Sequence, residues 1–424
     1  MKQEKVVERV YNMGRLRQAW QQVRKNAGAA GVDKMSVEDF EKREVELLSL
    51  IQEKLKAGHY KFKPARRVYI PKPGSSKKRG LGIPVVMDRI VSQSINLAFM
   101  DIFSIEFTSS NFGFQKGKSQ HQAIDKMRDI IVDGYNWCAS VDLQSFFDEI
   151  PHGLILKLIR RKIRDERLVT LVARALKSGV VEDGEFKKTV KGAPQGSPLS
   201  PMLSNIVLNE LDQELEKRGH KYCRWADDFL IFLKSERAAK RVMEGVSRYL
   251  EDELELQVNR EKSDVMQTNR ATFLGFQILR GRIRVSTKAA NIFKDKVREM
   301  SKRNNPLSMY QIIQELNEYL HGWVGYFRVQ EFKQIFRKLD EFTRCRLRSM
   351  QLKKWKKPKK FQRMMTRAGY KAIEANKTWI KMSKWQSVMR PQVRFVLNLK
   401  WFKQNGLITL ESFTKRHLKF DFGH

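Results

Sequence analysis

The chain has 424 residues, enough for two to four domains and a large buried core. Its 83 Lys and Arg residues against 47 Asp and Glu residues give a formal net charge of +36 and a pI of about 10.1. This excess indicates a polyanionic partner, nucleic acid first and an anionic membrane surface second. The three cysteines are far apart, so neither a disulfide framework nor a cysteine-based zinc site is expected.

Membrane insertion and secretion are not expected. No stretch approaches the roughly 18 consecutive apolar residues that read as a membrane span. The first 20 residues are charged and have a helical pattern, unlike a secretion signal. We therefore expect a cytoplasmic protein that binds nucleic acid and no membrane.

In chain order, the sequence predicts helices mixed with short strands, and then helices alone. Helices are expected up to about residue 56, at about 88–107 and 121–133, up to about 177, and at 200–218 and 237–253. Strands are expected at 66–70 and 79–84, flanking a basic tip at 71–78, and at 137–143, beside 227–228, around 258 and at 273–278. From about 287 the chain is predicted to be mostly helical. The pattern predicts an α+β unit followed by an all-α basic unit, with boundaries near 284–287 and 376.

Positive charge is concentrated in the last third of the chain. Residues 281–424 contain 34 Lys and Arg against 10 Asp and Glu, a net charge of +24. The densest stretch, residues 353–360, has apolar and aromatic residues around it, so a folded basic surface is expected and not a disordered tail. Lys and Arg with interleaved Trp suit phosphate neutralisation and base stacking, although helix core is the better interpretation for most of these Trp residues.

Two adjacent carboxylates, Asp227 and Asp228, lie between the apolar segments 222–224 and 229–232. This pattern predicts a β-hairpin with the aspartates at its turn. Ionised carboxylates in an apolar hairpin are costly unless a cation compensates them. Asp142 lies on another apolar strand, and three carboxylates at one point would suit two Mg²⁺ ions and displacement at phosphorus. Taken alone, the Asp pair is also compatible with a solvated turn.

Eight motifs resemble, in order and spacing, those of group II intron reverse transcriptases, the maturases encoded within self-splicing introns. The matching blocks are Leu-Gly-Ile-Pro at 81–84, Phe-Gly-Phe-Gln-Lys-Gly-Lys-Ser-Gln-His at 112–121, 142–148, Pro-Gln-Gly-Ser-Pro-Leu-Ser-Pro at 194–201, Trp-Ala-Asp-Asp at 225–228, 258–263, 273–276 and 316–327. The resemblance covers nearly the whole chain. It implies a right-hand polymerase with fingers and palm at 1–286, including an N-terminal extension, an α-helical thumb or maturase domain at 287–375, and a small basic DNA-binding region at 376–424.

The resemblance also implies a chemistry for the three aspartates. Asp142 and Asp227 would hold two Mg²⁺ ions, with Mn²⁺ as a possible substitute, and Asp228 would complete or support the site. One ion would lower the pKa of the primer 3′-OH, and the other would neutralise the triphosphate and the leaving pyrophosphate. Such chemistry needs no side-chain nucleophile, and none of the seven histidines belongs to a recognisable triad motif.

Further positions match the contacts that the family makes with its substrates. The dNTP contacts would be Lys72, Arg79, Phe146 and Gln195. The template and primer contacts would be Asn26, Gly28, Gly31, Arg66, Arg67, Gly196 and Trp225. Phe146 would exclude a 2′-OH, and alternation along an extended segment would place it on the same face as Asp142. The alternatives are solvated hairpin charge for Lys72 and Arg79, and core packing for Phe146.

Two blocks depart from the pattern of the family. Trp225 stands where Tyr is usual, and residues 115–118 read Gln-Lys-Gly-Lys where Arg-Pro-Gly-Arg is usual, which removes two guanidinium forks. The His and Cys cluster of the family's C-terminal endonuclease is not visible before His424. In this respect the chain resembles a short bacterial class without the endonuclease.

Three functions are compatible with these residues. The first is an RNA-directed DNA polymerase that copies an RNA template from a DNA primer and also binds its own intron RNA to assist splicing and retrohoming. The second is an RNA-binding splicing factor without polymerase activity. The third is a domesticated reverse transcriptase in DNA repair, phage defence or CRISPR adaptation. The oligomeric state is left open.

Overall fold

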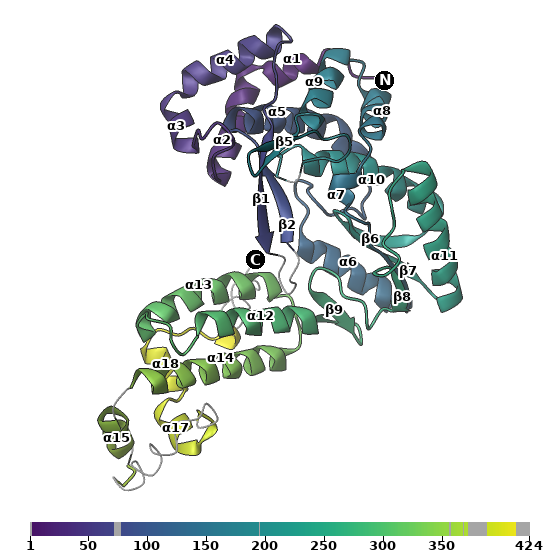
Figure 1. The fold of residues 1–424 in the computed structure, drawn as a ribbon. Helices are drawn as coiled ribbons and strands as arrows, with labels where there is room; N and C mark the ends of the chain where they lie inside the picture. Colours follow the sequence, from purple (N-terminus) through teal and green to yellow (C-terminus); the bar gives the residue numbers. More distant parts are fainter. Residues whose placement is uncertain are drawn as a thin grey trace, which may run out of the picture. The chain divides into compact units, whose positions relative to one another are not determined.

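The computed structural model describes residues 2–71, 78–194, 196–355, 358–367, 369–371 and 388–412. The chain divides into two compact units, Met1–Leu274 and Gly275–His424 (Figure 1). Helices and strands are mixed in the first unit, and the second is mainly helical, which confirms the predicted α+β class. The three-domain division at residues 286 and 375 remains a prediction. Lys72, Gln195 and much of the predicted region 376–424 lie outside the described residues.

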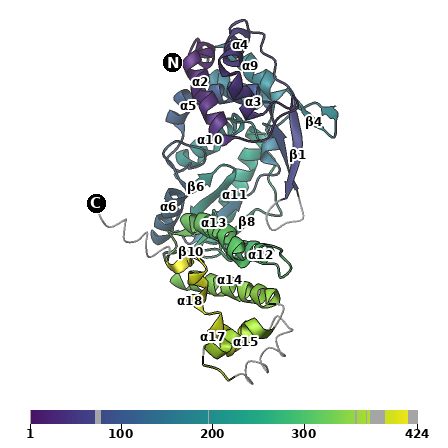
Figure 2. The same ribbon diagram turned by 90° about the vertical axis from the view of Figure 1, so that its left-hand side faces the viewer.

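The first unit begins with helices that build a base for its strands. They are α1 (Val6–Tyr11), α2 (Met13–Asn26), α3 (Val37–Lys42), α4 (Glu44–Lys56) and, after two strands, α5 (Val86–Phe103). Helix α2 buries Leu16, Ala19, Trp20 and Val23, whose spacing of three and four residues puts them on one face. Helix α2 packs beside α5 (Figure 2). The basic and polar residues of α2 are left on its outer side.

Strands β1 (Ala65–Pro71) and β2 (Lys78–Ile83) form the predicted ribbon. They pair antiparallel from Arg66 with Ile83 to Pro71 with Lys78, at the base of the basic tip. The sheet order is β2-β1-β4-β5, in which β4 (Val180–Glu182) runs parallel to β1 and pairs antiparallel with β5 (Glu185–Lys187). The last two strands were not predicted, because three residues are too few for a recognisable alternation.

A second sheet has the order β6-β7-β3-β8, with all neighbours antiparallel. Its strands are β3 (Trp137–Val141), β6 (Lys221–Trp225), β7 (Asp228–Leu233) and β8 (Asp264–Gln267). Helix α11 (Glu236–Arg248) covers β3, β7 and β8, and α6 (Gln120–Val132) packs against β6 (Figure 1). The strand predicted around Val258 is only a single bridge to Leu143, and the chain enters the sheet a few residues later as β8.

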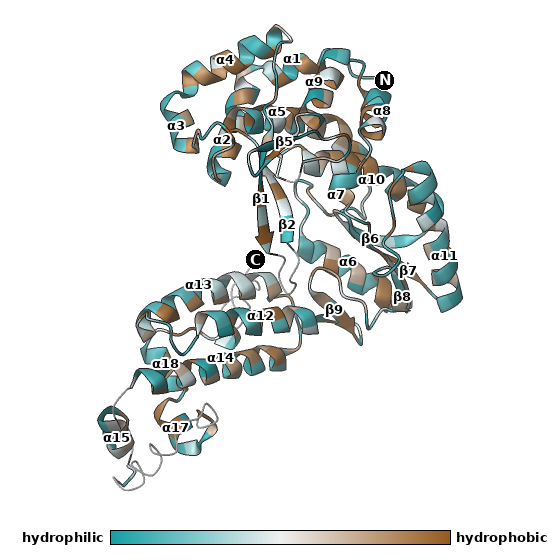
Figure 3. Cartoon of the chain, viewed as in Figure 1, coloured by the Kyte–Doolittle hydropathy of each residue, from teal (hydrophilic) through white to brown (hydrophobic). Residues whose placement is uncertain are grey.

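The remaining helices of the first unit are α7 (Phe146–Glu149), α8 (His152–Lys162), α9 (Glu166–Leu176) and α10 (Ser200–Lys217). There is also a 3₁₀ turn at Ser104–Glu106 and a π-helical turn at Tyr249–Glu253. Most helices carry hydrophobic and hydrophilic residues together (Figure 3). Helix α10 is buried along much of its length, packs against α8 and α5, and contacts β6. It therefore lies in the core, close to the hairpin that carries the Asp pair.

The second unit is built around an aromatic core. Its elements are β9 (Phe276–Leu279), β10 (Arg282–Val285), α12 (Thr287–Met300), α13 (Met309–Phe327), α14 (Lys333–Lys354), α15 (Pro358–Arg367), α17 (Pro391–Val396) and α18 (Leu399–Gln404). Trp323 of α13 contacts Phe293, Phe327 and Phe336, with ring centroids 4.5–5.8 Å apart. Trp323 and Trp355 are both buried, so these two Trp residues serve the helix core as predicted.

Candidate functional site

The predicted hairpin with the Asp pair is present. Strands β6 and β7 pair up to Trp225 with Asp228, which leaves Ala226 and Asp227 as a two-residue turn. Ala226 has a φ of 56°, in the left-handed region that costs a residue with a Cβ roughly 1–2 kcal/mol. Turns of this length need a positive φ at the first central position, and Gly or Asn is the usual residue there. The turn is therefore held in a strained conformation directly beside Asp227.

Asp142 comes to the same end of the sheet from β3. Val141 is paired with Phe229, so Asp142 and Asp228 are the next residues along two neighbouring strands. Burial raises the pKa of Asp227 above its ordinary value, and the negative charge of Asp142 raises it further, while the charges of Arg79 and Arg224 oppose the shift. The structure thus brings Asp142 and Asp227 into one electrostatic environment, with Arg79 near them.

The segment 257–263 supports Asp142. The backbone N–H of Asn259 donates to the Asp142 carbonyl at 2.8 Å, and the Asp142 N–H donates to Ser263 Oγ at 3.0 Å. Lys262 Nζ lies 3.5 Å from Asp142 Oδ2, between side chains that are 66% and 43% exposed. An ion pair this open contributes little and can be exchanged for another cation. The predicted block at 258–263 is therefore adjacent to the carboxylate site.

The carboxylates suit a metal that is completed by its substrate. Within the described residues, no group of three or more His, Cys, Asp and Glu side chains could hold a metal ion by itself. The sequence-based expectation of three carboxylates presented at one point is thus not met by a preformed cluster. Asp227 is half-buried in the turn and Asp228 is exposed at the start of β7. Mg²⁺ in phosphoryl-transfer sites commonly takes one or two carboxylates plus substrate phosphates, and Asp142 and Asp227 fit that donor set.

The predicted dNTP contacts differ in how the structure places them. Arg79 is exposed on β2, and its positive charge opposes the rise in the pKa of Asp227. Phe146 is only 2% exposed, and its ring meets that of Phe147 edge-on at 5.3 Å. The segment from Asp142 to Phe146 is not extended, because Ser145 has a φ of 48° and α7 begins at Phe146. The alternation argument for Phe146 therefore does not apply. Lys72 and Gln195 lie outside the described residues.

Two of the predicted template and primer positions adjoin the strands of the site. Gly196 has a φ of 113°, and a Cβ there would come within 2.3 Å of the Gly82 carbonyl, so this loop touches β2 closely. Trp225 is half-buried and closes the hairpin opposite Asp228. Their roles toward a nucleic acid remain predictions.

The Gly-rich loop at 26–33 is held by arginines. Arg66 donates to the Ala30 carbonyl from Nε at 3.2 Å and from Nη2 at 2.8 Å, and Arg89 donates to the Ala29 carbonyl. Asn26 and Gly28 are exposed, whereas the buried Gly31 packs on the backbone of Val85. Arg66 was predicted to touch template phosphates, and its guanidinium already has this backbone partner. Arg67 follows it and is half-buried.

Sequence reasoning missed a buried group behind the turn. Arg224 and Asp212 form an ion pair whose side chains are both fully buried. In the sequence, an Arg on a short strand and an Asp on a helix both read as surface residues. No local pattern links them, because their contact depends on how α10 packs against β6.

The chain is similar to proteins of known families. A reverse transcriptase (RNA-dependent DNA polymerase) model matches residues 70–278, and a group II intron maturase-specific domain model matches residues 290–369. Protein YkfC of Escherichia coli is 33% identical over 299 residues, covering 61% of this chain and 78% of YkfC. The group II intron-encoded protein LtrA of Lactococcus lactis is 27% identical over 327 residues, covering 61% of this chain and 54% of LtrA. The chain thus spans about half the length of LtrA.

Among solved structures, a chain of a partial Cas6-RT-Cas1–Cas2 complex is similar at 22% identity, with a TM-score of 0.37, over 58% of this chain and 42% of that chain. In the described part of the chain, no helix combines the length and apolar character that a membrane crossing requires. Both domain matches and the curated relatives agree with one another. The chain belongs to the group II intron reverse transcriptases and maturases, whose polymerase domain is that of RNA-directed DNA polymerases.

Proposed function

We propose that this chain adds dNTPs to the 3′-OH of a DNA primer on an RNA template, with Asp142 and Asp227 holding two Mg²⁺ ions and Asp228 supporting them. The observation that carries the proposal is that Asp142, just after β3, and Asp227, in the turn before β7, lie at the same end of the sheet, inside the region that matches reverse transcriptases. When bound, the ions would activate the primer hydroxyl and neutralise the triphosphate, and Mn²⁺ is expected to replace Mg²⁺.

The residues around the carboxylates would bind and select the nucleotide. Arg79 is exposed and acts on Asp227, so its guanidinium is available to a triphosphate bound there. Lys72 and Gln195 are proposed dNTP contacts on the motif resemblance alone. Phe146 is proposed to exclude a 2′-OH, which requires its ring to border the sugar in the substrate complex. Gly196 and Trp225 are proposed to contact the template and primer.

Primer extension on RNA and DNA templates tests the activity. Purified protein is mixed with Mg²⁺, dNTPs and a DNA primer annealed to each template, beside Asp227→Ala and Asp264→Ala variants. Asp264 is an exposed carboxylate on β8 of the same sheet, so it is a matched control. We expect cDNA from the wild type and Asp264→Ala and none from Asp227→Ala. Equal synthesis by Asp227→Ala would refute the assignment.

We further propose that the second unit binds the intron RNA to assist splicing and retrohoming. Support comes from the maturase-specific match and from a basic stripe on α15. Lys359, Arg363 and Arg367 are exposed, and their spacing of four residues puts them on one side of the helix. The opposite side carries the buried Phe361 and Met365. Such a stripe suits phosphate neutralisation, which makes affinity fall steeply with salt.

A charge-matched pair of triple variants tests the α15 stripe. One replaces Lys359, Arg363 and Arg367 by Gln, and the other does the same at Arg237, Lys240 and Arg241, which are exposed on α11. Binding to a group II intron RNA is measured across a salt series. The α15 variant should reduce the slope of log affinity against log salt by about 2–3, since each phosphate contact contributes roughly 0.7–0.9. Equal slopes for both variants would exclude the α15 stripe as a contact with the RNA.

We also propose a bacterial cytoplasmic location for the protein.

A further inference from the structure

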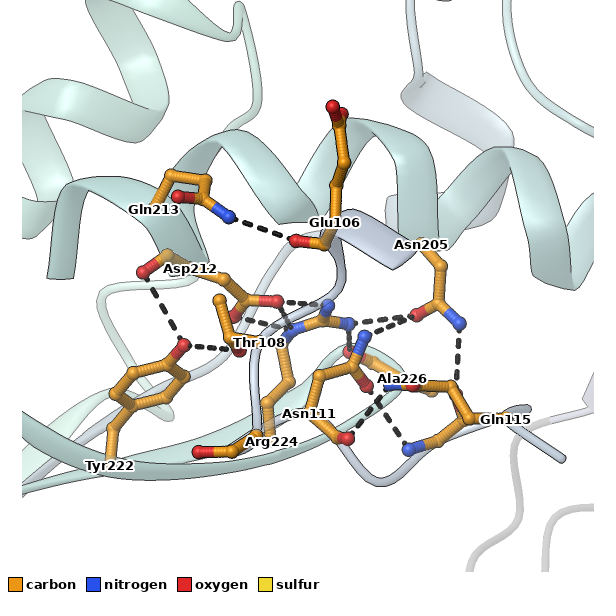
Figure 4. A network of polar contacts seen from close by, with 12 residues as sticks. Glu106, Thr108, Asn111, Gln115, Asn205, Asp212, Gln213, Tyr222, Arg224 and Ala226 are labelled. Carbon is orange, nitrogen blue, oxygen red and sulfur yellow. Dashed lines mark hydrogen bonds and ion pairs between the residues drawn. The ribbon is translucent and has the colours of Figure 1, made fainter. Parts of the chain in front are cut away.

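A buried polar cluster lies directly behind the Ala226-Asp227 turn (Figure 4). Arg224 Nε donates to both carboxylate oxygens of Asp212, at 2.8 and 3.0 Å. Its Nη1 donates to Asn205 Oδ1 and to the Ala226 carbonyl, both at 3.0 Å. One planar guanidinium therefore joins helix α10 to the carbonyl of the strained residue next to Asp227.

A second connection reaches the turn through the loop 110–113. Asn205 Nδ2 donates to the Gly113 carbonyl at 2.8 Å, and the Gly113 N–H donates to Asn111 Oδ1 at 3.1 Å. The loop also pairs with β6, because Phe112 N–H donates to the Arg224 carbonyl and Arg224 N–H donates to the Ser110 carbonyl, both at 2.9 Å. A Cβ on Gly113 would lie 2.4 Å from the Ala226 nitrogen. The turn thus rests on the bare backbone of Gly113.

Two lysines fix the far side of this loop. Lys118 Nζ donates to the carbonyls of Thr108 and Asn111 at 2.9 and 2.7 Å, and Lys126 Nζ donates to Ser110 Oγ at 2.8 Å. Lys118 stands where the family's block usually has its second arginine, and its ammonium group has backbone partners here. The loop is therefore held on both sides, by the lysines and by Asn205.

We propose that Gly113 and Asn205 are positioning residues for Asp227: they hold the Ala226-Asp227 turn where its carboxylate can serve the substrate-bound ions. The proposal rests on the proposed role of Asp227. A buried ion pair is a weak source of stability, since apolar residues of similar volume often stabilise as well, but it fixes geometry through directed hydrogen bonds. Here one further bond of Arg224 ends on the Ala226 carbonyl, and the positive φ of Ala226 is a conformation that persists only when its surroundings determine it.

Gly113→Ala is the sharpest test, with Gly153→Ala as its control. Gly113 does not have a positive φ, so the substitution adds no backbone strain and acts only through its methyl group against Ala226. A Cβ on Gly153, in α8 of the same unit, would meet nothing within 4 Å. We expect Gly113→Ala to lower kcat for primer extension 10- to 100-fold with an unchanged KM for the primer–template, because displacements of about 1 Å have effects of this size. Gly153→Ala should match the wild type.

Amide hydrogen exchange provides a readout that needs no polymerase activity. In Gly113→Ala, peptides from residues 222–233 should exchange faster than in the wild type, while peptides from α2 and α5 should not change. Unchanged exchange in the hairpin peptides together with an unchanged kcat would overturn the proposal. If the wild type is inactive on every template, the proposed function fails, and the exchange data still decide whether Gly113 holds the turn.

A second pair of variants on α10 guards against a folding defect in Gly113→Ala. Asn205→Ala removes the amide nitrogen that donates to the Gly113 carbonyl and the amide oxygen that accepts from Arg224. Asn209 lies one turn later on α10, is also buried, and its Oδ1 has no hydrogen-bond partner in the described structure. Asn205→Ala should reproduce the lower kcat and the faster hairpin exchange, and Asn209→Ala should not. Equal effects of the two variants on both readouts would reduce the role of Asn205 to packing and contradict the proposal.

Discussion

Lys262 Nζ and Asp142 Oδ2 lie 3.5 Å apart at the open end of the second sheet. Both side chains are well exposed, so the ammonium group holds the carboxylate only weakly. This contact places a built-in cation at a carboxylate proposed to bind Mg²⁺. In the proposed function, the two cations would compete for Asp142.

Lys262→Met should lower the Mg²⁺ concentration that the enzyme requires. Removing the competing ammonium group should lower the Mg²⁺ concentration for half-maximal primer extension by roughly 1.4- to five-fold, which corresponds to the 0.2–1 kcal/mol typical of exposed ion pairs. The measurement is a Mg²⁺ titration at saturating dNTP. Lys234→Met, an exposed lysine just after β7, is the control. A higher Mg²⁺ requirement in Lys262→Met would show that this lysine assists the site instead of competing.

Phe146→Val should admit ribonucleotides if its ring borders the sugar. We expect the ratio of kcat/KM for rNTP over dNTP to rise at least ten-fold, because the smaller side chain removes the clash with a 2′-OH. The ring is 2% exposed, so the variant should also lose on the order of 1–3 kcal/mol of stability. Nucleotide incorporation is therefore measured well below the melting temperature of the variant. Phe147→Val is the matched control, and an unchanged ratio in Phe146→Val would leave Phe146 as a core residue.

Alanine variants of Arg66 and Arg67 should distinguish a structural contact from a contact with nucleic acid. Arg66→Ala removes both hydrogen bonds to the Ala30 carbonyl, so amide exchange in residues 26–33 should become faster. Arg67→Ala should leave that exchange unchanged and lower the salt slope of primer–template binding by about one, as expected for one lost phosphate contact. If both variants change the slope equally and neither changes the exchange, the distinction fails.

Asp340 should make the second unit less stable as pH rises from about 4 to about 6. Burial raises the pKa of Asp340 to about 6, and the negative charge of Glu411 adds to the rise. The backbone N–H groups of Leu410 and Glu411 and the positive charge of Arg344 act in the opposite direction. In the unfolded chain the pKa is about 4, so between these values the folded state binds more protons than the unfolded state. The free energy of unfolding therefore decreases with pH in this window, by on the order of 2–3 kcal/mol, and is level above it.

Urea unfolding of the wild type and Asp340→Asn at pH 4.5 and 7 measures this effect. Asn cannot titrate, so the difference in stability between the two pH values should shrink in the variant. At pH 4.5 the stability of the variant should also fall, since Asn has one acceptor oxygen and its amide nitrogen cannot accept the second of the bonds from Leu410 and Glu411. The same pH dependence in both proteins would exclude Asp340 as its source.

Local patterns were sufficient for the elements of the site. The apolar segments beside Asp227 and Asp228 predict β6 and β7, and the two segments that flank the basic turn at 71–78 predict β1 and β2, because each pair of strands is close in sequence. The Asp142 strand was recognised from its apolar composition. Its position beside β7 was expected only from the motif resemblance.

Contacts between distant segments could not be predicted. The parallel pairing of β4 with β1 joins residues more than 100 positions apart. Phe146 was placed on an extended segment, but a left-handed Ser145 starts a helix there, and nothing in the local pattern indicates it. Likewise, Gly113 reads as an ordinary loop glycine until the backbone of Ala226 is found against it.

Single-nucleotide incorporation from a preformed complex with RNA template and DNA primer, at saturating dNTP and Mg²⁺, measures whether Asp227 takes part in nucleotide addition. The wild type, Asp227→Asn and Asp264→Asn are compared, and primer–template affinity is measured beside the rate. We predict a loss of at least about 10³-fold for Asp227→Asn, since a lost metal contact removes several kcal/mol of transition-state stabilisation, with unchanged affinity and a normal rate for Asp264→Asn. A wild-type rate in Asp227→Asn would contradict the account.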